Sequence, residues 1–206
     1  MLRIWGRENS SNVKKVLWCA EELELAYERI PAGGKHGVVD EPAYRALNPN
    51  GLVPTIEDDG LVLWESNAIV RYLAARYGEG VLWQGDPVRR AGADRWMDFS
   101  NSSLAAPYRD LMVNLVRSPP ERRDMAVVEA SVARMGHMLG HVDAALAEQP
   151  YLSGETLGIG DIPAGTLAQA WFALPIARPE LPNLAAWFAR LSERPAYRKA
   201  VLIPLT

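Results

Sequence analysis

The stretch Asn48–Pro54, NPNGLVP, decides the fold because its proline stands where the following residues read as the start of a strand. Proline has no amide hydrogen and is confined within sheets to strand starts, edges and bulges. The residue before a proline favours extended backbone, and an X-Pro bond reaches the cis form for about 0.5–1 kcal/mol. A sharp turn at Val53–Pro54 would leave the Val53 amide and carbonyl outside the sheet, where an extended peptide could pair with them. The motif therefore predicts a docking edge.

The residues after this motif predict a hairpin and then a helix. VPTIE and LVLW flank Asp58–Gly60, DDG, whose residues tolerate the positive φ of a tight turn. ESNAIVRYLAARYG follows as a helix with Ser66 as its expected N-cap and Gly78 as its stop. The amides at such a helix start favour a carboxylate, and Glu65 beside them can accept an ammonium group. Together these groups suit the α-carbon end of an amino acid.

The residues before the motif complete a small α/β domain. Leu2–Gly6 reads as a strand, a helix follows from about Ser11, and Ala26–Pro31 reads as a second strand. A strand, a helix and a strand in this order predict a right-handed crossover and a parallel pair. With a short helix at Pro42–Leu47, residues 1–80 are expected to have the order βαβαββα.

Beyond residue 80 the pattern predicts helices alone. We expect a linker at 81–87 and an all-α domain at 88–206, with one helix from about Pro87 to Arg117 and another from about Glu121 to Glu148. The second of these carries an apolar seam of Val128, Val132, Met135, Leu139, Val142 and Leu146.

The composition narrows the classes of partner. The 206 residues are 49% hydrophobic and 23% charged, which is typical of globular domains. A net charge of -3 gives no reason to expect nucleic acid or an anionic membrane. The start of the chain lacks a signal-peptide pattern and no apolar run is long enough to span a membrane, so we expect a cytoplasmic protein. A single cysteine, Cys19, excludes an internal disulfide and a multi-cysteine zinc site.

NPNGLVP, the hairpin, WESNAIVRYL and the ending LPNLAAWFARLSERPAY together resemble the glutathione transferase family over the whole chain. The resemblance implies a thioredoxin-like N-terminal domain, an all-helical C-terminal domain, a homodimer, a role in detoxification, and glutathione as co-substrate with no metal or other cofactor. It also implies that Val53 and Pro54 hold the cysteinyl backbone of glutathione, while Glu65 and Ser66 hold its γ-glutamyl end.

A thiol of pKa about 8.5 is only a few per cent ionised at neutral pH, so the reaction needs a group that stabilises the thiolate. The loop before the first helix offers Ser10, Ser11 and Asn12. By the resemblance, Ser10 matches the serine of theta and zeta classes, and Asn12 matches bacterial relatives of the disulfide-bond oxidoreductases. The loop has no tyrosine and no cysteine, which argues against the classes that use them. The alternative is that Ser11 or Asn12 merely caps the helix.

Other candidates have competing interpretations. Lys35 and His36 lie where the family often places a basic residue for the glycyl carboxylate, although the alignment needs an insertion and a solvated loop is the alternative. Cys19 is expected to be a buried hydrophobe, and His137 and His141 to lie on a solvated helix face rather than to bind a metal. By the family's architecture, residues of the long helix line a pocket for the electrophile, although ordinary core packing also explains some of them: Trp96, Phe99, Asn101, Pro107 and Tyr108.

The sequence therefore predicts a transferase that conjugates glutathione to a small hydrophobic electrophile. Two alternatives remain at this point: a glutathione-dependent disulfide reductase or peroxidase on the same site, and a non-catalytic binding module with the same fold.

Overall fold

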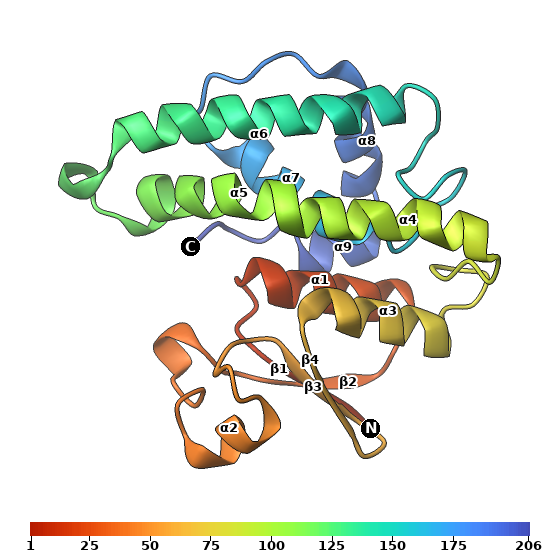
Figure 1. Ribbon diagram of the computed structural model, residues 1–206. Coiled ribbons are helices and arrows are strands. Elements are labelled where there is room, and N and C mark those ends of the chain that lie inside the picture. The colour runs from red at the N-terminus through yellow and green to blue at the C-terminus, as the bar shows by residue number, and fades with distance from the viewer. The chain divides into compact units, whose positions relative to one another are not determined.

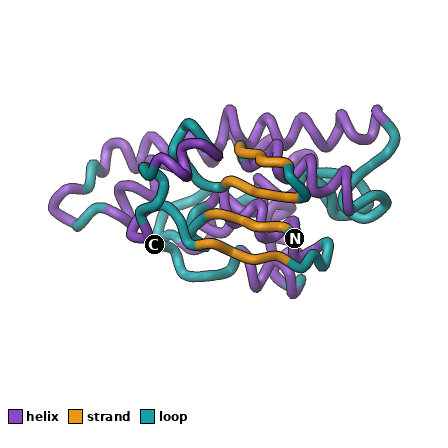
Figure 2. The backbone as a smooth tube through the Cα atoms, turned by 90° about the horizontal axis from the view of Figure 1, so that it is seen from below, coloured by secondary structure: helices purple, strands orange, loops and turns teal.

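Four short strands form a single sheet in the first part of the chain, in the computed structural model that describes all residues 1–206 (Figure 2). The strands are β1 (Leu2–Trp5), β2 (Tyr27–Ile30), β3 (Thr55–Asp58) and β4 (Leu61–Trp64), in the spatial order β2-β1-β3-β4. β1 pairs parallel with β2 and antiparallel with β3, and β3 pairs antiparallel with β4. The predicted crossover pair and hairpin are thus confirmed.

The strand register gathers four loops at one end of the sheet. Trp5, the last residue of β1, lies opposite Ile30 of β2 and Thr55 of β3, and Thr55 lies opposite Trp64 of β4. The ends of β1, β2 and β4 and the start of β3 are therefore level with one another. We call the loops that meet there, residues 6–10, 31–41, 48–54 and 65, the loop end of the sheet.

Helices cover the sheet and bury its core. They are α1 (Ser11–Glu22), α2 (Pro42–Leu47), α3 (Ser66–Tyr77) and α9 (Pro195–Ala200). α1 and α3 pack against each other on the same face of the sheet (Figure 1). Apolar residues at helical spacing on these two helices, such as Val13, Val16, Ile69 and Leu73, are fully buried, as are Ile4 and Ile56 of the strands. Arg76, one turn beyond Leu73, is exposed and pairs with Asp59 instead.

The last helix belongs to the sheet unit. The chain divides into one unit of Met1–Trp83 with Pro195–Ile203, and a second unit of Gln84–Arg194 with Pro204–Thr206. The boundaries expected from the sequence place all of 88–206 in the helical domain, and the structure differs because α9 packs on α1. The rings of Trp18 and Tyr197 meet edge to face at 4.7 Å, and Nζ of Lys14 donates to the carbonyl oxygen of Val201 over 2.9 Å.

The second unit is all-helical, as expected. Its α-helices are α4 (Pro87–Phe99), α5 (Ala105–Leu111), α6 (Met125–Leu146), α7 (Asp161–Ala173) and α8 (Pro182–Ser192). No helix of the structure is long and apolar enough to cross a membrane.

The expected long helix at 87–117 is continuous but not α-helical throughout. Ser100–Leu104 and Met112–Arg117 are π-helical and flank α5. Pro107, near the start of α5, has no N–H to donate to the carbonyl four residues earlier, so one α-helical hydrogen bond is missing at the end of the first π-helical stretch.

α6 begins four residues later than the sequence pattern indicates. Asp124 occupies its N-cap and accepts the amide of Val127 over 3.1 Å, while Pro120–Arg122 forms a separate 3-10 turn. An aspartate at this position stabilises the orphan amides of a first turn, so the helix starts there. Of the predicted seam, all residues but Val132 are buried.

Asp161 connects three parts of the helical unit. Its buried carboxylate accepts hydrogen bonds from the amides of Leu152, Ser153 and Gly158, at 2.8, 3.2 and 3.1 Å, and from Nε1 of Trp187 at 3.0 Å. Burial raises the pKa of this carboxyl, and the N–H donors act against that rise. Trp187 lies on α8, so one side chain fixes the start of α7, the 152–158 loop and α8.

Candidate active site

Ser10 lies at the loop end of the sheet, at the N-cap position of α1. Its backbone is extended, with φ −76° and ψ 125°, as a cap residue requires, yet its side chain makes no cap hydrogen bond. The residue is only 8% exposed. A serine hydroxyl at this position ordinarily accepts an amide of the first turn. The Ser10 hydroxyl is therefore available to a ligand, beside the free amides at the start of a 12-residue helix.

The alternative that Ser11 or Asn12 caps α1 is wrong. Both residues lie inside the helix, which begins at Ser11, and Ser10 has the cap position. Ser11 is half-buried and Asn12 is exposed.

Asn12, Lys15 and Ser66 form a polar cluster that joins α1 to α3. Nζ of Lys15 donates to Oδ1 of Asn12 over 3.0 Å, and the Ser66 hydroxyl donates to the same oxygen over 3.3 Å. The Lys15 ammonium also reaches Oγ of Ser66 at 3.5 Å. We call these three residues the α1–α3 cluster. It brings one residue of the predicted donor loop together with one residue of the predicted γ-glutamyl site.

Lys15 is buried, with 3% of its surface exposed. Burial lowers the pKa of Lys15 to about 8, and the negative charge of Glu65 acts in the opposite direction. The sequence pattern did not single out this residue. The available signal was a lysine within the buried face of α1, one turn after Asn12, at a spacing that places both side chains on one side of the helix.

Ser66 is not the N-cap of α3, which corrects the sequence-based assignment. The helix begins at Ser66 itself, and Glu65 holds the cap position with a left-handed φ of 73°. Because Glu65 makes no cap hydrogen bond and is exposed, its carboxylate stays available. Ser66 is buried, with 6% exposed, and the first amides of α3 start at this residue. A ligand carboxylate suits these amides, and a ligand ammonium suits Glu65.

Val53 and Pro54 lie at the start of β3, and the peptide bond between them is cis. Neither the amide nor the carbonyl of Val53 takes part in a hydrogen bond within the chain. This backbone segment is therefore free to pair with an extended ligand at the loop end of the sheet.

Two side chains that the sequence analysis did not identify hold this segment. The hydroxyl of Tyr44 donates to the carbonyl oxygen of Leu52 over 2.6 Å, and Nδ2 of Asn48 donates to the same oxygen over 2.9 Å. Both groups also lie within 3.1 Å of Oγ1 of Thr55. Asn48 is the first residue of the NPNGLVP motif, so the first asparagine of that motif holds the loop in place.

Lys35 and His36 are exposed on the 3-10 turn Gly34–His36, and neither side chain has a hydrogen bond or ion pair within the chain. The turn nonetheless adjoins the site. A Cβ on Gly33 would lie 3.3 Å from both γ-methyls of Val53, and a Cβ on Gly34 would lie 3.0 Å from Cδ of Arg7. Lys35 and His36 therefore stand at the exposed rim of the loop end.

The other candidates have structural roles or none. Cys19 is fully buried, and burial raises the pKa of its thiol. His137 and His141 are exposed, with ring centroids 5.1 Å apart. No group of three or more histidine, cysteine, aspartate or glutamate side chains in the structure is placed to hold a metal ion.

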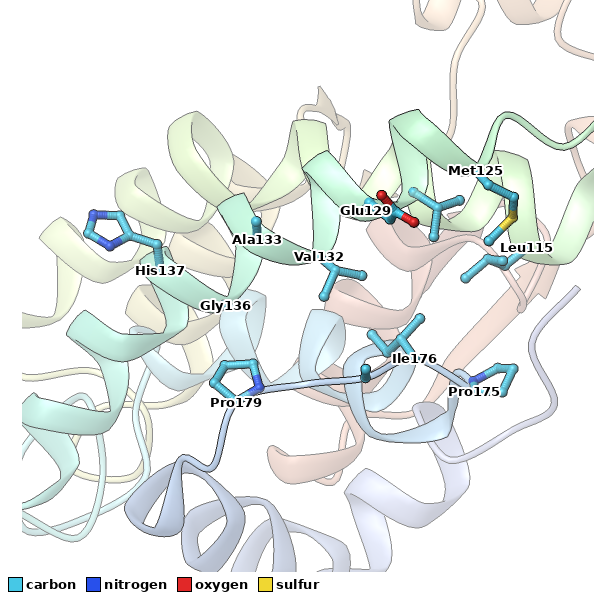
Figure 3. Close-up of a pocket in the computed structure, with 12 residues that line it drawn as sticks. Leu115, Met125, Glu129, Val132, Ala133, Gly136, His137, Pro175, Ile176 and Pro179 are labelled. Carbon is cyan, nitrogen blue, oxygen red and sulfur yellow. The ribbon is translucent and has the colours of Figure 1, made fainter.

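The helical unit contains an apolar groove of about 430 Å³ (Figure 3). It runs between one side of α6 and the segment 175–179 after α7, and Gly136 lets the chain approach closely because a Cβ there would lie 3.1 Å from Pro179. The half-exposed Val132 of the seam lines it. None of the five residues expected to face an electrophile lines this groove; of these, Trp96 and Pro107 are buried in the helical unit.

Comparisons with known proteins agree with this geometry. Residues 9–76 match the glutathione S-transferase N-terminal domain, and residues 109–195 match the glutathione S-transferase C-terminal domain. The chain is 47% identical over 208 residues to glutathione S-transferase GstB of Escherichia coli, with 100% of both chains covered.

Solved structures give the same result. A theta-class glutathione S-transferase of Xanthomonas axonopodis pv. citri, solved with glutathione bound, superposes with a TM-score of 0.97 at 56% identity, over 100% of this chain and 99% of that one. Glutathione transferase F7 of Populus trichocarpa gives a TM-score of 0.88 at 25% identity, over 97% of both chains. The resemblance seen in the sequence is confirmed, and the chain belongs to the glutathione S-transferase family.

Proposed function

We propose that this chain binds glutathione at the loop end of its sheet, stabilises the thiolate, and conjugates it to a small hydrophobic electrophile. The observation that carries the proposal is the Ser10 hydroxyl, which occupies an N-cap position without making the cap hydrogen bond. Such a hydroxyl at a helix N-terminus is suited to donate to an anion outside the protein.

Glutathione fits the loop end as an extended peptide with a charged amino-acid terminus. The unpaired backbone of Val53 takes the cysteinyl residue, which orients the sulfur toward the start of α1. Ser66 and the first amides of α3 take the γ-glutamyl carboxylate, and Glu65 takes the ammonium group. Lys35 or His36, at the rim, take the glycyl carboxylate.

Ser10 then donates its hydroxyl hydrogen to the sulfur, and Asn12 is the second candidate for this role. Each unit by which the thiol pKa falls below about 8.5 gains up to tenfold in thiolate at neutral pH, for about 1.4 kcal/mol. The thiolate attacks an electrophilic carbon with its lone pair and forms a C–S bond. The electron pair leaves with the displaced group, or is taken up with a proton from water where the attack is an addition.

Three parts of the proposal rest on the family's general pattern. They are the hydrophobic nature of the electrophile, the assembly of two chains into a homodimer, and the cytoplasmic location, and each stays a prediction. The disulfide reductase alternative needs the same glutathione thiolate. Because the only thiol of the chain, Cys19, is fully buried, such a reductase would act through glutathione rather than through a cysteine of the protein.

The test is an ultraviolet difference spectrum of bound glutathione thiolate, titrated with pH on the wild type, Ser10→Ala and Asn12→Ala. We expect a thiol pKa well below 8.5 in the wild type and a return toward that value in Ser10→Ala. If the thiol pKa returns toward 8.5 in Asn12→Ala and not in Ser10→Ala, the donor is Asn12. Glutathione that binds but titrates as it does in water would leave only the non-catalytic binding module.

A further inference from the structure

Lys15 is the one buried charge that contacts both ends of the proposed site. Its ammonium group lies 3.0 Å from Asn12, in the turn that carries the thiolate donors, and 3.5 Å from Ser66, at the carboxylate end. A buried lysine is costly to keep charged, so its placement between two polar side chains needs a reason.

The contact with Asn12 settles which way that carboxamide faces. A lysine ammonium has only donors, so the atom of Asn12 that faces it is the oxygen. The Ser66 hydroxyl donates to the same oxygen. Nδ2 of Asn12, on the other side of the amide carbon, is then the free donor of an exposed residue.

The contact with Ser66 places a positive charge where the ligand carries a negative one. Ser66 is the first residue of α3, whose free amides already favour a carboxylate. The charged group that faces Lys15 from this side is Glu65, and its carboxylate is exposed and proposed to hold the ligand ammonium. Asn12 and Ser66 are neutral, and the neighbouring Lys14 points to the carbonyl of Val201 instead. Lys15 is thus complementary to a ligand carboxylate at Ser66.

We propose that Lys15 is a positioning residue of the glutathione site, which orients the Asn12 amide and the Ser66 hydroxyl and supplies a buried positive charge to the γ-glutamyl carboxylate. The inference rests on the proposed function, because it needs glutathione at the loop end. It predicts that the affinity for glutathione depends on the protonation of Lys15.

The pH range of this dependence follows from burial. In the free protein the pKa of Lys15 is lowered to about 8, and a carboxylate bound beside it raises that pKa. The ligand therefore binds best below pH 8, and its affinity falls as the pH rises through the range between the two values.

The experiment is isothermal titration calorimetry with reduced glutathione and with S-methylglutathione, whose sulfur cannot ionise, at several pH values between 6.5 and 9.5. The variants are Lys15→Met, which removes the charge, and Lys15→Arg, which keeps it at every pH tested. Lys14→Met is the matched control, because Lys14 is equally buried on the same helix and its ammonium group donates to the Val201 carbonyl.

We expect Lys15→Met to bind S-methylglutathione at least tenfold more weakly than the wild type at pH 7, and Lys14→Met to bind it within threefold of the wild type. The wild-type affinity should fall above pH 8 more steeply than that of Lys15→Arg, while the amino group of the ligand titrates alike in both.

Equal affinity of Lys15→Met and the wild type at every pH would overturn the inference, and so would equal losses in Lys15→Met and Lys14→Met. If circular dichroism shows that Lys15→Met is unfolded, the test is the comparison of Lys15→Arg with the wild type. The same pH dependence of ligand affinity in both proteins would contradict a role for Lys15. A wild type that binds neither ligand at any pH contradicts the proposed function itself.

Discussion

The hydroxyl of Tyr44 on α2 lies 2.6 Å from the carbonyl oxygen of Leu52, two residues before Pro54. Tyr44 is 2% exposed, so its ring anchors the loop from inside the domain. The backbone proposed to pair with glutathione is therefore positioned by a side chain buried inside the domain.

Replacing Tyr44 with phenylalanine should weaken glutathione binding several-fold. The variant loses one hydrogen bond, about 0.5–1.5 kcal/mol, and leaves only Asn48 on the Leu52 carbonyl. Calorimetric titration with glutathione measures the effect. Tyr77→Phe is the control, because the Tyr77 hydroxyl donates to Asp58 at the opposite, hairpin end of the sheet. Similar losses of affinity in both variants would show that the loss reflects general stability.

Ser66→Ala and Ser10→Ala should separate binding from activation. Ser66→Ala removes a hydroxyl whose one hydrogen turns from Asn12 to the ligand carboxylate. The bond to a charged group contributes about 1.5–3 kcal/mol and the bond given up about 0.5–1.5 kcal/mol, so the dissociation constant of glutathione should rise several-fold to about tenfold. The pKa of the bound thiol should stay as in the wild type, since the sulfur is proposed to lie beside Ser10 at the start of α1. Ser10→Ala should show the reverse, a raised thiol pKa with a dissociation constant changed little. Each is read from one pH titration of the bound thiolate, and identical profiles in the two variants would contradict the division of roles.

Asp161→Ala should lower the free energy of unfolding by about 3–5 kcal/mol. The substitution leaves three amides, two of them buried, and the buried Trp187 indole without their acceptor, and each unsatisfied buried donor costs about 1–3 kcal/mol before the structure relaxes. The free energy of unfolding is measured by urea denaturation, with tryptophan fluorescence as the signal. Glu148→Ala, at an exposed position, serves as the control and should change the value by less than about 0.5 kcal/mol. A midpoint for Asp161→Ala equal to that of the control would contradict the role given to this carboxylate.

The buried lysines should make the protein more stable in mildly alkaline solution. Burial lowers the pKa of Lys14 and of Lys15 from 10.5 to about 8. The unfolded chain therefore binds more protons than the folded one between pH 8 and 10.5, and stability rises with pH in that window. For Lys15 alone, the gain between pH 8 and 9.5 is about 1–2 kcal/mol by linkage.

The measurement is urea unfolding of the wild type and of Lys15→Met over this range. The unfolding free energy of the wild type minus that of Lys15→Met should increase as the pH rises. A difference that is independent of pH would show that Lys15 keeps its ordinary pKa. The range stops at 9.5 because burial raises the pKa of Tyr27 and Tyr197, whose ionisation acts in the opposite sense above pH 10.

The sequence predicted the architecture well where local signals agree. The strand and helix order, the Asp58–Gly60 turn and the extent of α2 follow from periodicity, turn residues and the proline at its start. The position of Ser66 was misjudged by one residue because a glutamate with positive φ at the cap is not a pattern that propensity favours.

The candidate site was predicted only as far as each residue carries its own signal. Ser10, Val53 and Glu65 lie at loop ends that the element order locates. Lys15 and Tyr44 went unnoticed because their importance lies in contacts across the chain, with Ser66 and Leu52, which no local pattern encodes. The one local signal was a charged residue, Lys15, on an apolar helix face, and an assignment by hydrophobic periodicity disregards such a residue.

The placement of α9 affects when the protein can become functional. Residues 195–203 are the last part of the sheet unit to leave the ribosome, and they follow residues 84–194 of the helical unit. Until they do, Trp18 lacks its Tyr197 partner and Lys14 lacks the Val201 carbonyl. The helix that begins at the proposed thiolate site is thus packed only when residues 195–203 are present. A polypeptide truncated before Pro195 would hold every proposed glutathione contact in its sequence but lack part of the scaffold that supports them.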